Sequence, residues 1–454
     1  MNTSAVTSPF PKPSDTYELV RLGYVARLQN GLTVDAKRDV TGDVVTNPYL
    51  RVANVQAGSL DLKSVTEITV PRSVARRSTL RPGDVLMTEG GDLDKLGRGT
   101  VWQGELDQCL HQNHIFAVRP DPQRLSGRFL AYVTQSLYAR HYFESTGTRT
   151  TNLASTNSSK IQSFPLPLPP LEEQRRIADF LDAETTRIGM LARLRSRSLD
   201  LLSEQAVARM DSAVRGDSTG QTRQAEYSPM GQIPAHWREG RLRSVDCDVQ
   251  TGPFGSQLHA EDYVADGWPV INPANITPSG LAADNHVTVN SETRERLARH
   301  ILQVGDVVFG RRGELGRAGV VSAEQGGWVC GTGSLRVRFR EHAFHSGYLR
   351  RYLTIPAVRH YFQLHAIGST MANLNTSILL NMPLLLPEIR DQVSIAQACD
   401  EIEEETAARV TLVKRQLALL AERRQALITA AVTGQFDVST ASGRNATDGV
   451  SASP

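Results

Sequence analysis

The side chains best suited to hold an anion or the edge of a base lie in two glycine-rich segments. "GGDLDKLGRGT" carries Lys95 and Arg98, and "GRRGELGRAG" carries Arg311, Arg312 and Arg317. Glycine lets a backbone approach a surface closely, and arginine pairs with phosphate or with the O6/N7 edge of guanine. A single such loop could be a solvated turn with surface charge. Because the loop occurs twice, we expect these residues to contact a nucleic acid.

A second segment offers hydroxyl groups beside an arginine. "GTRTTN" (147–152) contains Arg149 and Thr150, whose side chains suit hydrogen bonds to phosphates and base edges. Its later counterpart, "GSTMAN" (368–373), lacks the arginine. The alternative interpretation is a helix-entry loop whose hydroxyls cap backbone amides.

Sequence patterns that would indicate catalysis are missing. No G-x-x-x-x-G-K-[S/T] phosphate loop occurs, and "TNPYL" (46–50) lacks the second proline of the adenine-methyltransferase motif and has no cofactor loop beside it. His111 and His114 have no third ligand nearby, so we expect no metal site and no cofactor. The aromatics of "RHYF" (140–143 and 359–362) lie late in helical patterns, which favours core packing over base stacking.

Composition places the chain among globular proteins of several domains. It has 454 residues, a formal net charge of only +2 and 22% charged residues, so a nucleic-acid contact must come from local clusters of basic residues. The four cysteines are far apart, which indicates reduced thiols. No apolar run reaches the ~18 residues of a membrane span, and we expect a cytoplasmic protein.

The segments expected to position these residues occur twice in the sequence. Gly83-Asp84-Val85 recurs as Gly305-Asp306-Val307, "RHYF" recurs, and Asn152-Leu153 recurs as Asn373-Leu374. "PLPLPPLEEQRRIADFLDAETTRI" (165–188) recurs as "PLLLPEIRDQVSIAQACDEIEEET" (383–406). The offsets stay between 218 and 222 residues, which indicates a tandem duplication of a unit of about 220 residues.

Each copy combines a mixed domain with a long helix. Short β-branched runs broken by Gly, Asn and Asp predict strands and turns, and helical patterns follow at Phe129–Phe143 and Tyr348–Phe362. From Gln174 to Arg215, and from Gln392 to Thr433, no proline interrupts the chain, which predicts helices of about 60 Å. Their apolar stripes need a partner, so we expect them to pack on each other.

The predicted fold class is therefore α+β. Two α/β domains in tandem are each followed by a long helix, and the two helices form an antiparallel coiled coil with pseudo-two-fold symmetry. The predicted boundaries are 1–164 and 217–382 for the domains, 165–216 and 383–438 for the helical segments, and 439–454 for a disordered tail. Such an arrangement suits two separated half-sites on DNA, and since the domains differ in sequence, the target should be bipartite and asymmetric.

The quoted motifs resemble the conserved regions of type I restriction–modification specificity subunits. "LEEQRRIADFLD" and "LITAAVTGQFDV" carry the resemblance, together with the duplicated Gly-Asp-Val turns and Gly-Arg loops, over about residues 15–438. The resemblance implies two target-recognition domains that read double-stranded DNA without catalysis. It also implies helices that dock methyltransferase subunits, two in number by expectation, and a motor and nuclease subunit that joins for cleavage.

The resemblance implies that the assembled complex is an adenine-specific DNA methyltransferase and a type I site-specific deoxyribonuclease. Two alternatives remain. One is a two-headed protein–protein adaptor, and the other is a specificity subunit of a methylation-only system. A self-contained nuclease or methyltransferase would be established by turnover with the single chain.

Overall fold

The computed structural model divides into two compact units. Unit 1 comprises residues 1–196 and 414–454, and unit 2 comprises residues 197–413. The structure describes residues 12–33, 42–91, 96–149, 154–216, 220–254, 257–277, 279–313, 315–340, 343–366 and 374–440. Lys95, Thr150 and residues 441–454 of the predicted tail (439–454) lie outside these ranges, whereas Val438–Thr440 form a 3-10 turn. The predicted domain boundaries remain predictions.

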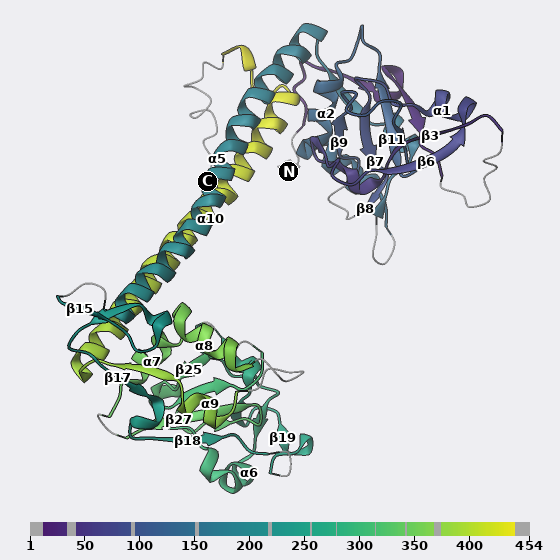
Figure 1. The fold of residues 1–454 in the computed structure, drawn as a ribbon. Coiled ribbons are helices and arrows are strands. Elements are labelled where there is room, and N and C mark those ends of the chain that lie inside the picture. The colour runs from purple at the N-terminus through teal and green to yellow at the C-terminus, as the bar shows by residue number, and fades with distance from the viewer. Residues whose placement is uncertain are drawn as a thin grey trace, which may run out of the picture. The chain divides into compact units, whose positions relative to one another are not determined.

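Unit 1 is built on a four-stranded antiparallel sheet of order β2-β11-β7-β9 (Figure 1). In a second sheet, β10 pairs parallel and β6 antiparallel with β3. A small sheet has the order β12-β13-β8, and β1 pairs with β14. The strands are β1 (Glu18–Arg21), β2 (Ala26–Asn30), β3 (Val44–Leu50), β4 (Val55–Gln56), β5 (Ser59–Leu60), β6 (Thr66–Pro71), β7 (Val85–Thr88), β8 (Gly90–Gly91), β9 (Gly99–Val101), β10 (Leu110–His111), β11 (Ile115–Pro120), β12 (Thr148–Arg149), β13 (Ala154–Ser155) and β14 (Pro165–Leu168).

Unit 2 repeats this plan with β18-β27-β24-β25 as its main sheet. Here β26 pairs parallel with β20, as β10 does with β3 in unit 1, and β17 pairs with β28. The strands are β15 (Thr222–Gln224), β16 (Gln232–Pro234), β17 (Arg238–Arg241), β18 (Cys247–Thr251), β19 (Tyr263–Val264), β20 (Trp268–Ile271), β21 (Ile276–Thr277), β22 (Gly280–Leu281), β23 (Thr288–Val289), β24 (Val307–Gly310), β25 (Ala318–Val320), β26 (Val329–Cys330), β27 (Ser334–Phe339) and β28 (Pro383–Leu386).

Short helices follow the sheets in both units. They are α1 (Arg72–Ser78), α2 (Gly127–Gln135), α3 (Leu137–Thr146), α4 (Ser158–Gln162), α6 (Ser291–Arg296), α7 (Ser346–Tyr352), α8 (Pro356–Ala366) and α9 (Thr376–Leu380). The pattern predicted as helical over Phe129–Phe143 is two helices, because Ser136 interrupts it. The Ser136 hydroxyl donates to the carbonyl of Val133 at 2.6 Å and accepts from the amide of Ala139 at 3.2 Å, so it caps α3.

The two long helices are α5 (Leu171–Arg215) and α10 (Ile389–Val432), close to the predicted ranges. Within unit 1 an early part of α5 lies beside the end of α10, where the rings of Phe180 and Phe436 are 5.6 Å apart. Within unit 2 Arg209 pairs with Glu405 at 2.8 Å, and Val214 shares a core with Ala396. In each unit, late positions of one helix meet early positions of the other, so the segments pack antiparallel.

A glycine ends each long helix against an aromatic ring. Gly434 has a φ of +72° and lies on Tyr17, and Gly216 has a φ of +73° and lies on Trp237. A Cβ at either glycine would come within 2.7 Å of the ring, and the left-handed conformation disfavours other residues. Unit 1 is therefore closed by residues from two distant parts of the sequence.

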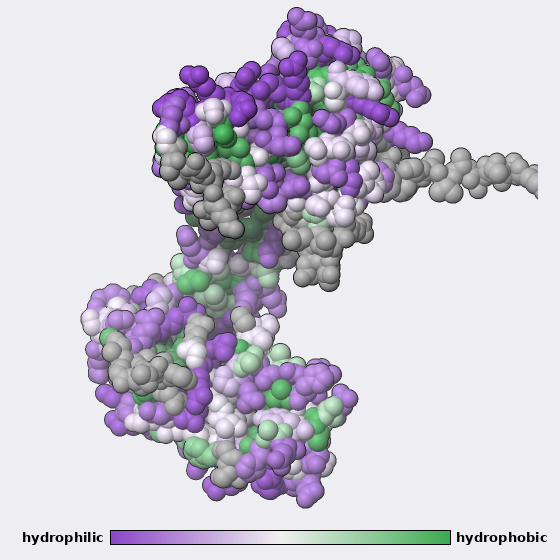
Figure 2. All heavy atoms as spheres, turned by 90° about the vertical axis from the view of Figure 1, so that its right-hand side faces the viewer, coloured by the Kyte–Doolittle hydropathy of each residue, from purple (hydrophilic) through white to green (hydrophobic). Residues whose placement is uncertain are grey.

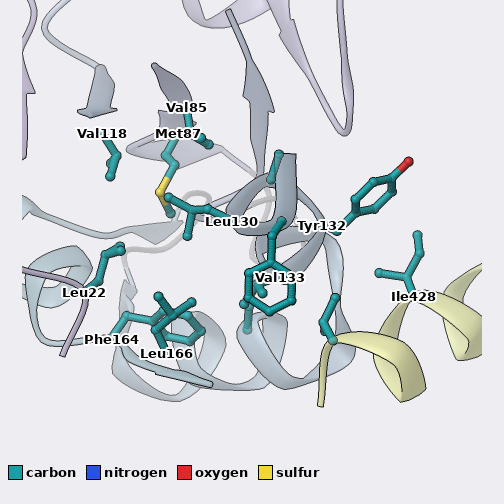
Figure 3. Close-up of a cluster of buried hydrophobic side chains, with 14 of the residues drawn as sticks. Leu22, Val85, Met87, Val118, Leu130, Tyr132, Val133, Phe164, Leu166 and Ile428 are labelled. Carbon is teal, nitrogen blue, oxygen red and sulfur yellow. The ribbon is translucent and has the colours of Figure 1, made fainter. Parts of the chain in front are cut away.

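The core of unit 1 joins the main sheet, α2 and the long helices (Figure 3). Val85 and Met87 of β7 face Leu130 and Val133 of α2, and Ile428 of α10 belongs to the same cluster. On the face drawn in Figure 2, hydrophilic residues dominate the described surface of each unit, and hydrophobic ones form small separate patches. Among the described residues, no helix has the length and apolar character needed to cross a membrane.

Candidate nucleic-acid interface

A buried ion pair anchors the turn that precedes the glycine-rich loop in both units. Asp84 is 1% exposed, and its carboxylate accepts two hydrogen bonds from the Arg119 guanidinium, both at 2.7 Å. Asp306 accepts the same pair of bonds from Arg338, at 2.7 and 2.6 Å. The equivalent bidentate geometry fixes β7 and β24 relative to β11 and β27.

The structure brings the two predicted segments of unit 1 together. Ala154 of β13 pairs with Gly91 of β8 on one side and with Arg149 of β12 on the other. β8, which precedes the segment of Lys95 in the sequence, is therefore separated from the strand of Arg149 by β13 alone. Arg98 is half-buried, and its carbonyl accepts the amide of Thr88 at 3.2 Å. Only the backbone of Arg149 is described.

Unit 2 shows the same neighbourhood with different contacts. The carbonyl of Arg311 accepts the amide of Leu374 at 2.8 Å, and Arg311 Nε donates to the carbonyl of Leu374 at 3.2 Å. Arg312 is exposed. Arg317 Nη2 donates to the carbonyl of Pro273 at 2.7 Å, and its Nε is buried without a partner in the described part of the chain. Arg317 therefore also braces the turn at Pro273.

Close packing explains why glycine is needed in these loops. Gly97 has a φ of +65°, and a Cβ there would lie 2.5 Å from the ring of Phe143. Gly316 has a φ of +87° and would meet Phe362 at 2.9 Å. Both phenylalanines are buried, which confirms the interpretation of "RHYF" as core rather than as a stacking surface. The loops are thus pressed onto the cores of their own units.

The two histidines considered as a metal pair have separate partners. His111 is fully buried, and its Nδ1 donates to the carbonyl of Ile115 at 2.9 Å. Burial lowers the pKa of His111 to about 4. His114 Nδ1 instead pairs with the carboxylate of Glu89 at the surface. Among the described residues, no group of three potential ligands could hold a metal ion.

Sequence reasoning missed two turns that adjoin the loops. They are the 3-10 turns η2 (Val52–Asn54) and η7 (Pro273–Asn275), which follow Arg51 and Asn272. The shared signal was the pair "VANV" and "PANI", with asparagine at the same place in each. It is too short to stand out without the structure.

Comparison with known proteins agrees with this architecture. Residues 14–195 match the model of the type I restriction modification DNA specificity domain. The type I restriction enzyme EcoKI specificity subunit of Escherichia coli K12 is 22% identical over 400 residues, which cover 86% of this chain and 82% of the relative. The chain is therefore similar to type I restriction enzyme specificity subunits over most of its length, and residues 14–195 match the DNA specificity domain of such systems.

Two further similarities differ in extent. The chain is 22% identical over 211 residues to the putative type I restriction enzyme MjaX specificity subunit of Methanocaldococcus jannaschii. That match covers 46% of this chain and about half (48%) of the relative. A solved structure from work on complex assembly and conformational transition of the type I R-M system has a TM-score of 0.71 at 21% identity. The match includes 94% of this chain and the whole of the chain in that structure, and the likeness shows the fold.

Proposed function

We propose that this specificity subunit reads double-stranded DNA with both units and performs no chemistry itself. Each unit reads one half of a bipartite, asymmetric target, and α5 and α10 set the unread spacer between the halves. One observation supports this most strongly. The buried Asp84–Arg119 and Asp306–Arg338 pairs hold equivalent frames, while the loops on those frames carry different side chains. Two units with the same backbone support but different loop side chains are suited to reading two different DNA sequences.

In this proposal the predicted basic residues supply the DNA contacts. Arg312 is exposed and can pair with a phosphate or with guanine, and Arg311 lies beside it. Arg98 takes in unit 1 the place of Arg317, because the amides of Thr88 and Gly310 donate to their respective carbonyls. Lys95, Arg149 and Thr150 belong to the same segments of unit 1. Arg317 is the weakest candidate, because its guanidinium already holds the carbonyl of Pro273.

The long helices also offer places for partner subunits. Met190, Leu191 and Leu194 of α5 are 57%, 43% and 68% exposed within unit 1, and Leu201 of α5 and Leu412 of α10 are 50% and 57% exposed within unit 2. Neighbouring exposed apolar side chains such as Met190, Leu191 and Leu194 suit a contact with another protein. We propose that two methyltransferase subunits dock here, and that a motor and nuclease subunit completes the restriction complex. Adenine methylation and DNA cleavage would belong to those partners. A cytoplasmic location is part of the same proposal.

The test is an exchange of recognition domains. Residues 1–164 are replaced by those of a relative in one chimaeric chain, and residues 217–382 are replaced in a second. Each chain is expressed with a methyltransferase partner, and modified adenines are mapped by sequencing. The first exchange should change one half of the methylated target, and the second should change the other half. A change of both halves by one exchange would contradict independent reading.

The same experiment separates the alternative functions. Methylation at a defined target with no cleavage in the presence of every partner indicates a methylation-only system. A chain that binds proteins but shows no salt-dependent binding to DNA, even with partners present, is an adaptor. Turnover by the purified single chain would overturn the assignment of catalysis to the partners.

A further inference from the structure

A surface formed by three segments recurs at the same place in both units. Its segments are the 3-10 turn η2 or η7 with the residue before it, the two residues that follow β7 or β24, and the turn that precedes β11 or β27. The amide of Glu89 donates to the carbonyl of His114 at 2.9 Å, and the amide of Arg311 donates to that of Gly333 at 2.9 Å. We call this the three-segment surface. These matching bonds make Glu89 and Arg311 equivalent, and likewise His114 and Gly333.

The 3-10 turn is held in the same way in both units. In unit 1 Asn54 is buried, its Oδ1 accepts the amide of Arg51 at 2.8 Å, and its Nδ2 donates to the carbonyl of Asp61 at 2.8 Å. In unit 2 Asn275 Oδ1 accepts the amide of Asn272 at 3.1 Å. Arg51 and Asn272 therefore occupy equivalent, fixed positions. The buried asparagines hold the turns, and the residues before them vary.

The polar side chains at these equivalent positions differ completely. Unit 1 presents Arg51, Glu89, Asn113 and His114, with Glu89 and His114 joined by a hydrogen bond. Unit 2 presents Asn272, Arg311, Arg312 and Thr332. Arginine and asparagine suit purine edges, whereas glutamate accepts from the amino group of cytosine. The two surfaces thus offer different patterns of donors and acceptors on one backbone plan.

In unit 2 the surface is hollowed. A cavity of about 310 Å³ is lined by Asn272, Pro273, Arg311, Arg312, Thr332 and Gly333. Gly333 keeps it open, since a Cβ there would lie 2.9 Å from Pro273. Arg312 and Thr332 are exposed, and no hydrogen bond or ion pair with another described residue engages their side chains. In unit 1 the equivalent of Gly333 is His114, whose ring contacts the carboxylate of Glu89.

We propose that the three-segment surface determines the specificity of each unit, with Arg312 and Thr332 reading bases in unit 2 and Glu89 and His114 in unit 1. This inference rests on the proposed function and adds the residues that distinguish the two halves of the target. The hydrogen bond between Glu89 and His114 opens when the bases arrive, so that the carboxylate can accept from an exocyclic amino group.

Single substitutions test the surface in the full-length chain with its methyltransferase partner. Arg312→Gln and Thr332→Ala should relax or alter one half of the methylated target, and Glu89→Gln should alter the other half. The loss of a bidentate contact to a base should weaken methylation of the original target by about ten- to a hundredfold. Arg312→Lys keeps the charge without the planar fork, so it should retain the salt dependence of binding and still lose base preference.

Matched controls and outcomes keep the inference separate from the proposed function. Arg340→Gln in unit 2 and Arg124→Gln in unit 1 each replace an exposed arginine that lies outside the three-segment surface. Both should leave the methylated target unchanged. Thermal unfolding of each variant shows whether it is folded. Unchanged targets in folded Arg312→Gln, Thr332→Ala and Glu89→Gln overturn the inference alone, as does a single variant that alters both halves. If the unsubstituted chain and partner methylate no defined target, the proposed function fails first.

Discussion

The strongest single prediction concerns the buried carboxylate of Asp306. It accepts the bidentate pair from Arg338 and, through Oδ2, the amide of Gln303 at 2.7 Å. Asp306→Ala removes the partner of a guanidinium that is 28% exposed and leaves a backbone amide unpaired beside the core. Asp306→Asn preserves the shape and one acceptor but removes the charge.

The magnitude follows from burial. Breaking a fully buried ion pair by removing one partner costs about 3–5 kcal/mol of unfolding free energy. Arg338 keeps some access to water, and its Nη2 also bonds to the carbonyl of Ile301 at 3.0 Å, which reduces the cost. We therefore expect Asp306→Ala to cost about 2–4 kcal/mol, and Asp306→Asn about 1–2 kcal/mol, the scale of a charge-assisted hydrogen bond.

The assay is urea unfolding of the full chain, followed by tryptophan fluorescence. Three of the four tryptophans, Trp237, Trp268 and Trp328, belong to unit 2, so the signal follows that unit. Asp246→Asn is the control, because Asp246 and its partner Arg340 are 58% and 80% exposed. It should change the stability by less than about 0.5 kcal/mol. If Asp306→Ala costs no more than this control, the argument that the pair anchors the frame is refuted.

Two further predictions concern a histidine and a glycine. Because the pKa of His111 is about 4 in the folded chain, the unfolded state binds the extra proton first as the pH falls below about 6.5. The free energy of unfolding of unit 1 should fall by on the order of 3 kcal/mol between pH 6.5 and pH 4. His111→Gln should flatten this part of the pH profile of urea unfolding, and an unchanged profile would contradict the assignment of this loss to His111. Gly316→Ala should cost about 2–4 kcal/mol, from backbone strain and the clash with Phe362. Gly313→Ala, with a φ of +84° and no atom within 4 Å of the added Cβ, isolates the strain, so equal costs would exclude the clash.

The sequence predicted the parts of the fold that are specified locally. Long stretches without proline predicted α5 and α10, and the repeated Gly-Asp-Val turns marked the frame that Asp84 and Asp306 now anchor. The late position of Phe143 in a helical pattern predicted its burial. Such features depend on neighbours along the chain, so one sequence can reveal them.

Other features depend on distant parts of the chain and could not be predicted. Asn152 and Asn373, which were aligned by sequence, lie outside the described residues; the structure shows instead that Asn157 and Asn375 occupy equivalent places, where they cap α4 and α9 through bonds of 3.0 and 2.9 Å. The equivalence of Arg51 and Asn272 is also supported by distant backbone bonds, since the preceding carbonyls of Leu50 and Ile271 accept the amides of Gln112 and Gly331. The bond between Arg317 and the carbonyl of Pro273 likewise crosses 44 residues, so the loop gave no sign that this arginine is already engaged.

The closure of unit 1 by two distant parts of the sequence has a consequence for biosynthesis. Leu427, Ile428, Ala431 and Val432 belong to its core, so a ribosome must make nearly the whole chain before this core can be completed. Unit 2 is continuous in sequence and can form earlier. A nascent chain thus holds unit 1 with an apolar face open until α10 emerges, and termination before α10 would release a product prone to aggregate.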